Sequence, residues 1–185
     1  KDLSVGNGDS FLMWGYLSAA ISLAVIVMLL ATNDPRFAWL YMVIPIAGFT
    51  ASGIKTYKAK RKSHVASTYA SNTINNVWAI ISAVFAVYAI SCLLHFGEVR
   101  SWNGMFLLGM LLPGIGTYTT GVILKEKSIQ MCGLLGVVIG TGLLRDFVCG
   151  EQVISIMQMG QMVLSFVITL IIPGHILNFK AKKQQ

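Results

Sequence analysis

Apolar residues in this sequence come in long blocks, separated by short clusters of charged, polar or proline residues. A helix needs about 20 mostly apolar residues to cross the hydrocarbon core of a bilayer. Six blocks reach that length. The pattern therefore predicts an all-α, polytopic membrane protein whose six transmembrane helices form three consecutive hairpins within a single transmembrane domain, residues 1–185. The predicted spans are 11–32, 37–57, 74–96, 104–124, 129–149 and 153–177.

Composition supports a bilayer as the surrounding medium. Hydrophobic residues make up 55% of the chain and charged residues 11%, whereas an ordinary soluble domain carries roughly 25% charged residues. The first block is a poor secretory signal, because its apolar core is too long and no small-x-small cleavage pattern follows Ala31-Thr32. We therefore expect it to remain as a membrane span.

The distribution of Lys and Arg predicts the orientation, since these residues favour cytoplasmic loops. An inside N-terminus leaves only Arg36, Arg100 and Arg145 outside, and both termini then face the cytoplasm. Trp14 and Trp78 fall near the predicted inner boundary, as expected of interfacial aromatic belts. The basic residues placed inside are Lys1, Lys55, Lys58, Lys60, Arg61, Lys62, Lys125, Lys127, Lys180, Lys182 and Lys183.

Two of the predicted hairpins resemble each other. Proline, a glycine three residues later and another eight residues later occur as Pro45, Gly48 and Gly53 in span two, and again from Pro113 in span four. We infer a weak internal repeat of a helical hairpin in parallel orientation. Pro45 and Pro113 are expected to kink their helices, because each removes a helical hydrogen bond. Pro173 lies near the inner end of span six.

The stretch GIGTYTTG, residues 114–121, raises the question of a phosphate-binding loop. A Walker loop needs Gly-Lys-Ser/Thr between a strand and a helix, and neither the Gly-Lys pair nor the strand is present here. Glycines at helical spacing instead predict close helix packing in lipid. The glycines assigned to packing are Gly48, Gly109, Gly116, Gly133, Gly136 and Gly140.

Polar residues form one stripe on span six, with Gln158, Gln161, Ser165 and Thr169 at helical spacing. A polar stripe inside a bilayer must face protein or water. It predicts either hydrogen bonding between helices or the lining of a polar pathway. Arg145 and Asp146 would then lie at the outer mouth of that pathway, or form part of a neutralised outer rim.

No catalytic or metal-binding constellation is present in the sequence. CxxC, HExxH and serine-elbow motifs are missing, as are paired carboxylates on one helix face. Met157 and Met159 point in nearly opposite directions on a helix, so these methionines are predicted to serve packing rather than copper binding. We predict no enzyme activity, no cofactor, no metal and no nucleic-acid partner.

Several short motifs resemble a family of small, uncharacterised bacterial integral membrane proteins of about 200 residues. The motifs are SFLxWGxL at 10–17, GIGTxxxGxxLK at 114–125 and IPGHxL at 172–177, and the similarity covers essentially the whole chain. The resemblance implies a multi-pass protein of the bacterial cytoplasmic membrane. It also implies a helical cytosolic segment before the first span, of which residues 1–9 would be a remnant.

Two functional hypotheses follow from these patterns. The first is a non-enzymatic interaction or regulatory membrane module, in contact with membrane lipids and associating with itself or a membrane-protein partner through its glycine faces. The second is a small transporter or channel whose pathway runs beside Gln158, Gln161 and Ser165.

Overall fold

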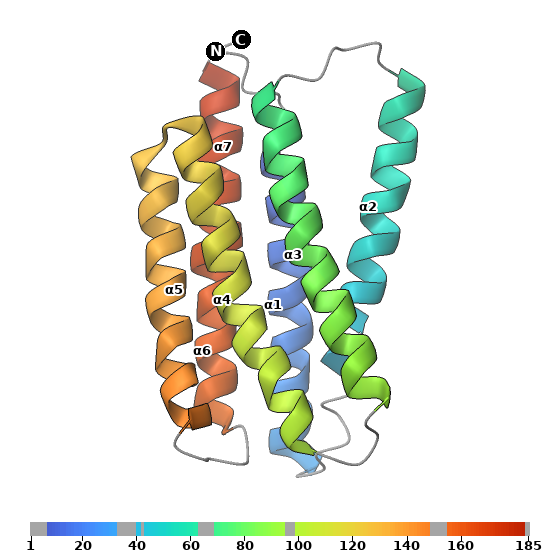
Figure 1. The fold of residues 1–185 in the computed structure, drawn as a ribbon, viewed down its shortest axis with the longest axis vertical. Coiled ribbons are helices and arrows are strands. Elements are labelled where there is room, and N and C mark those ends of the chain that lie inside the picture. The colour runs from blue at the N-terminus through green and yellow to red at the C-terminus, as the bar shows by residue number, and fades with distance from the viewer. Residues whose placement is uncertain are drawn as a thin grey trace.

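The computed structural model describes residues 7–32, 40–41, 43–62, 69–94, 99–148 and 155–183. Its helices are α1 (Asn7–Thr32), α2 (Val43–Lys62), α3 (Tyr69–Leu94), α4 (Val99–Leu124) and α5 (Lys127–Val148). A C-terminal rod follows, made of α6 (Ile156–Phe166), the π-helical segment η2 (Val167–Ile171) and α7 (Ile172–Lys183). The helices stand side by side along one axis (Figure 1). The described residues contain no strand, which confirms the all-α class.

Four of the described helical segments are long and apolar enough to cross a membrane, and they indicate a membrane protein. Large apolar side chains face outwards along them, for example Leu30 at 63% and Val87 at 65% exposure. Such a surface suits hydrocarbon rather than water. The four segments are Gly8–Thr32, Tyr69–Cys92, Gly104–Leu124 and Ile156–Lys183.

The second predicted span differs from the observed helix. Span two was expected over 37–57, but α2 begins at Val43 and its apolar part covers only Val43–Ile54. Pro45 consequently lies in the first turn, where backbone N–H groups have no helical acceptor in any case. The expectation of a mid-span kink at Pro45 is therefore wrong, because this proline removes no hydrogen bond from the helix. Pro113, in contrast, lies inside α4.

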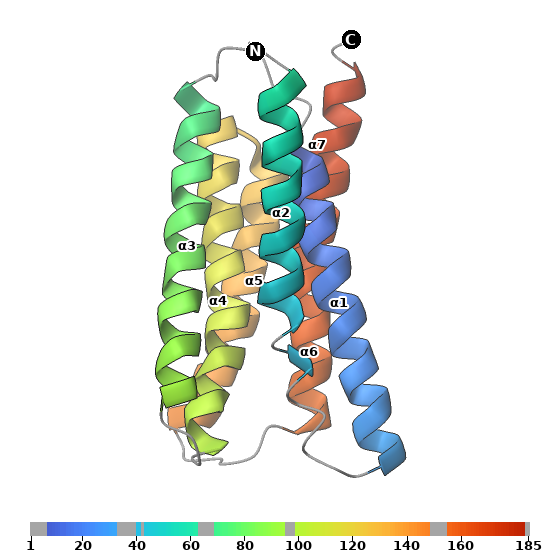
Figure 2. The same cartoon turned by 90° about the vertical axis from the view of Figure 1, so that its right-hand side faces the viewer.

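The start of α1, the end of α7 and the α4–α5 turn meet at one end of the bundle (Figure 2). Asn178 Nδ2 donates to Asp9 Oδ1 at 2.8 Å, which joins α7 to α1. Lys180 forms an ion pair with Glu126 in the turn between α4 and α5. These contacts gather several basic residues of the chain at the same end.

The closest packing in the bundle joins α4 to α5, and glycines make it possible. A Cβ atom added to Gly114 would lie 2.9 Å from the backbone nitrogen of Val137. A Cβ atom on Gly133 would overlap the backbone of Tyr118, and one on Gly121 would lie 2.6 Å from the backbone nitrogen of Gln130. The two backbones therefore touch along most of their length, as small residues allow in lipid.

The internal repeat has a structural counterpart in two Trp–Gly contacts. The ring of Trp14 in α1 fills the space beside Gly48 in α2. The ring of Trp78 in α3 packs in the same way on Gly116 in α4, where an added Cβ would lie 3.2 Å from Trp78 Cη2. In each hairpin, a tryptophan near the start of the first helix thus packs against the first repeated glycine of the second helix.

Replacing Gly133 by Ala tests the backbone contact between α4 and α5. The added methyl group would overlap Tyr118 backbone atoms, and overpacking of this kind costs about 1–3 kcal/mol. We expect Gly133→Ala to lower the melting temperature of the protein in detergent. Gly142→Ala on the same helix is the matched control, because a Cβ there meets nothing within 4 Å. Equal melting temperatures for the two variants would contradict the close contact.

Candidate functional site

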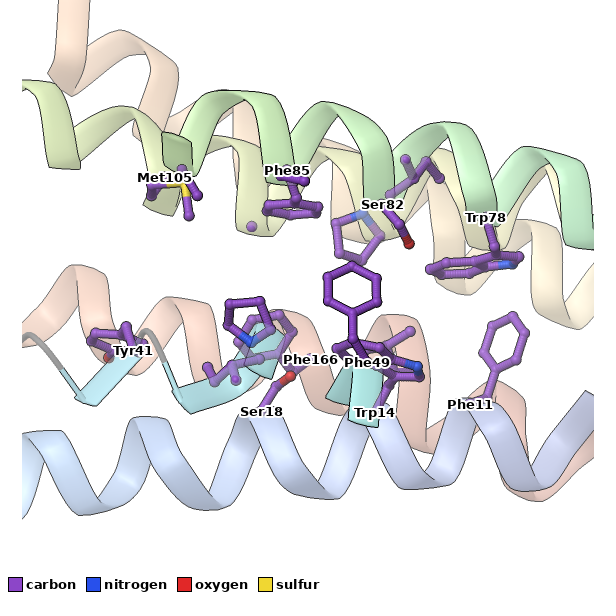
Figure 3. A pocket seen from close by; sticks show the side chains of 18 of the residues that line it. Phe11, Trp14, Ser18, Tyr41, Phe49, Trp78, Ser82, Phe85, Met105 and Phe166 are labelled. Carbon is purple, nitrogen blue, oxygen red and sulfur yellow. The ribbon is translucent and has the colours of Figure 1, made fainter. Parts of the chain in front are cut away.

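A cavity of about 280 Å³ lies inside the bundle, between α1, α2, α3, α4 and the C-terminal rod. Its volume is close to the lower end of the range for small-molecule sites, about 300–1,000 Å³. Every one of these elements contributes an aromatic side chain to the wall (Figure 3). Among the described residues, all of the side chains that line the cavity are uncharged.

Edge-to-face aromatic pairs connect the walls at both ends of the cavity. Phe11 of α1 and Trp78 of α3 have ring centroids 5.1 Å apart at an interplanar angle of 81°. At the opposite end, Tyr41 and Phe106 of α4 lie 4.9 Å apart at 75°. Such pairs contribute about 0.5–1.5 kcal/mol beyond their buried area. The long axis of the cavity therefore runs between two aromatic bridges.

The side of the cavity between α2 and α3 is open. α2 packs against α1, where Trp14 and Phe49 form a third aromatic pair with centroids 5.6 Å apart. Phe49 is nevertheless 42% exposed, and Ala86 and Asn75 on α3 are exposed although both line the cavity. The ribbons of α2 and α3 stand apart along this side of the bundle (Figure 1). In a bilayer, a mouth on this side opens towards lipid.

Two serine hydroxyl groups point into the middle of the cavity from opposite walls, Ser18 from α1 and Ser82 from α3 (Figure 3). Ser18 is only 3% exposed. The backbone of α4 adds an acceptor nearby, since Pro113 has no N–H with which to bond the carbonyl of Gly109 in the preceding turn. Gly109 and Pro113 both line the cavity. A mostly apolar cavity thus carries a small group of neutral polar atoms at mid-depth.

The polar stripe of the C-terminal rod does not line the cavity. Gln158 caps its own helix, since its side chain accepts from the backbone of Ser155 at 2.8 Å. Gln161 is half-buried, and Ser165 is fully buried. The residues that this rod contributes to the cavity are instead Met162, Phe166 and Leu170.

Thr169, the last residue of that stripe, joins the rod to α4. Pro173 cannot donate to the carbonyl of Thr169, because proline has no N–H. Thr117 of α4 donates to this carbonyl instead, with Oγ1 and O 2.7 Å apart. The helix is π-helical over Val167–Ile171 at this point, where Ile172 N–H reaches the carbonyl of Val167. Thr117, within GIGTYTTG, therefore replaces a backbone donor of the neighbouring rod.

The predicted packing glycines have two different surroundings. Gly48, Gly116, Gly133, Gly136 and Gly140 each have atoms of another helix where a Cβ would stand. Gly109 does not, since the nearest such atom is Met162 Sδ at 4.0 Å, and its empty side faces the cavity. The side chains of Arg145 and Asp146 lie outside the described residues.

The cavity was not predicted from the sequence, although the sequence contains a signal for it. Phe11, Trp14 and Ser18 follow a helical spacing on α1 and face one space, as do Trp78, Ser82 and Phe85 on α3. The tryptophans were assigned to interfacial belts because of their depth alone. Their spacing with other aromatic and serine positions would have indicated a shared inner face.

Comparison with known proteins gives no match. No family model matches the sequence, and neither a curated protein nor a solved structure matches the chain.

Replacing Thr117 by Val tests the hydrogen bond between α4 and the rod. The change keeps the shape of the side chain but leaves the Thr169 carbonyl without this donor, so we expect a loss of about 1 kcal/mol in stability in detergent. Thr119→Val is the matched control, because Thr119 Oγ1 donates to the carbonyl of Ile115 in its own helix, at 2.8 Å, and not to the rod. A melting temperature as high for Thr117→Val as for the control would contradict the assigned role.

Proposed function

We propose that this protein is a non-enzymatic membrane module that binds a lipid-soluble molecule in the cavity between α2 and α3. The proposal rests on a cavity whose walls are aromatic and whose described lining residues are all uncharged. This cavity opens at the side of the bundle, between α2 and α3. A water-soluble substrate would have to enter past an aromatic bridge at either end. A molecule dissolved in the bilayer can enter directly between the two helices.

The nature of the walls also limits what can bind. Burial away from water gives no advantage to a ligand that comes from lipid, because both environments are apolar. Affinity must therefore come from aromatic contacts and from hydrogen bonds made in a dry site. The Ser18 and Ser82 hydroxyl groups are among the lining groups that can supply such bonds.

We further propose that six helices span a bacterial cytoplasmic membrane, with the basic end of the bundle in the cytoplasm. The observed gathering of Lys125, Lys127, Lys180, Lys182 and Lys183 with the start of α1 supports this orientation. The short apolar part of α2 would cross the membrane together with the turn that precedes it. Anionic head groups would then lie against this basic end.

A small transporter is the second candidate, and the position of the cavity favours it. The cavity lies between the hairpin α1–α2 and the hairpin α3–α4, which carry the repeated Trp–Gly contacts. Transporters built from repeats commonly hold their substrate at the interface between the repeats. The solute would be apolar, and its pathway would run beside α2 and α3 rather than beside Gln158 and Gln161.

Filling the cavity tests the proposed binding. Gly109→Leu would place a side chain into the empty space beside α4, because no atom lies nearer than Met162 Sδ at 4.0 Å. Gly160→Leu is the matched control, since Gly160 is exposed on the rod and a Cβ there meets nothing within 4 Å. The probe is a fatty alcohol that carries a diazirine on its chain, and the sites of photolabelling are mapped by mass spectrometry.

We expect labelling of cavity residues such as Phe85 and Ala86 in the wild type and in Gly160→Leu. In Gly109→Leu, this labelling should fall at least roughly fivefold, as expected when about 1 kcal/mol of binding is lost. The proposal would be contradicted if labelling were spread evenly over the lipid-facing helices. It would also be contradicted if labelling of the cavity residues were unchanged in Gly109→Leu.

A further inference from the structure

Ser18 is a buried polar residue in the wall of the cavity. Only 3% of the residue is exposed, and its hydroxyl group faces the cavity (Figure 3). Ser82 faces the same space from the opposite wall. Hydrocarbon chains offer these hydroxyl groups no hydrogen bond, whereas an occupant with polar atoms at this depth gains hydrogen bonds in an apolar environment, where they are strong. The cavity therefore favours an occupant that offers oxygen or nitrogen atoms at this depth over a purely apolar one.

The polar atoms lie among aromatic rings. Trp14 and Phe49 form an edge-to-face pair beside Ser18, and Phe166 of the rod lies at the same level of the cavity (Figure 3). Aromatic walls bind a flat ring well, through edge-to-face and offset contacts. Hydroxyl donors on two opposite walls suit a ring that carries acceptor oxygens on its two opposite edges. The carbonyl of Gly109 can in turn accept a bond from a hydroxyl group on such a ring.

The lack of charge on the described lining residues further limits the class of ligand. A phosphate or carboxylate at this depth would have no counter-ion, because the described lining residues are all uncharged. Lys125, Lys127, Lys180, Lys182 and Lys183 lie away from the cavity, at the end of the bundle where α1 begins and α7 ends. The polar part of the occupant is therefore neutral.

From these observations we infer that the cavity binds a lipid-soluble quinone. Its ring lies between Ser18 and Ser82, its carbonyl oxygens accept from the two serine hydroxyl groups, and its apolar tail leaves through the mouth between α2 and α3. The reduced form would donate to the Gly109 carbonyl. This inference rests on the proposed function, since it names the ligand class for the same cavity.

Binding of a benzoquinone with a decyl tail to the purified protein in detergent tests the inference, measured by calorimetric titration. Decylbenzene is the matched ligand, with the same tail and a ring that lacks the oxygens. Ser18→Ala combined with Ser82→Ala removes both donors. The control is Ser91→Ala on α3, because Ser91 Oγ donates to the carbonyl of Val87 in its own helix at 2.9 Å. Melting curves establish that each variant is folded.

We expect the quinone to bind the wild type and Ser91→Ala equally. Its Kd should rise about tenfold in the double variant, and decylbenzene should bind the wild type about tenfold more weakly than the quinone. Equal affinity for quinone and decylbenzene would overturn the inference, and this comparison needs no variant. The proposed function would survive that result if Gly109→Leu still reduced photolabelling by the fatty alcohol. If Gly109→Leu changed neither quinone binding nor photolabelling, both proposals would fail.

Discussion

Contact between the backbones of α4 and α5 is the constraint on which the rest of this bundle depends. Lipid supplies no hydrophobic force between helices, so close approach and hydrogen bonds must hold them together. Gly114 and Gly133 bring the two backbones together, and the Thr117 hydroxyl group bonds the Thr169 carbonyl of the C-terminal rod. α4, α5 and the rod therefore form a closely packed unit. α1 joins this unit through Gly15, where an added Cβ would lie 2.7 Å from the side chain of Ile171.

The cavity lies beside α2 and α3, two helices whose described glycines make no such close contact with each other. α2 is held by α1 through Gly48, and α3 is held by α4 through Gly116. Each helix turns a bulky ring, Phe49 or Phe85, towards the space between them. Bulky rings occupy space between two helices, whereas glycines let helices approach closely. The same physical rule that closes the α4–α5 contact therefore leaves an aromatic-walled space between α2 and α3.

The sequence predicted the helices well because block length and the absence of charge are local properties. It did not place the start of α2, because Pro45 is equally compatible with a mid-span kink and with a first turn. Gly133 and Gly136 indicated a close helix contact but could not identify the neighbour, since a glycine pair leaves its partner unspecified. The hydrogen bond from Thr117 to the Thr169 carbonyl could not be predicted either, since a threonine in a helix does not specify which neighbouring helix accepts its hydroxyl group. The cavity needed the relative positions of helices that are distant in the sequence.

The central claim is that α2 and α3 stand apart in a bilayer and hold a non-protein molecule between them. A density map of the protein in lipid nanodiscs tests this claim most directly. We predict elongated density, not accounted for by the chain, between Phe49 and Phe85 and reaching the level of Ser18. A map in which α2 packs directly on α3, so that their side chains fill this space, would contradict the account.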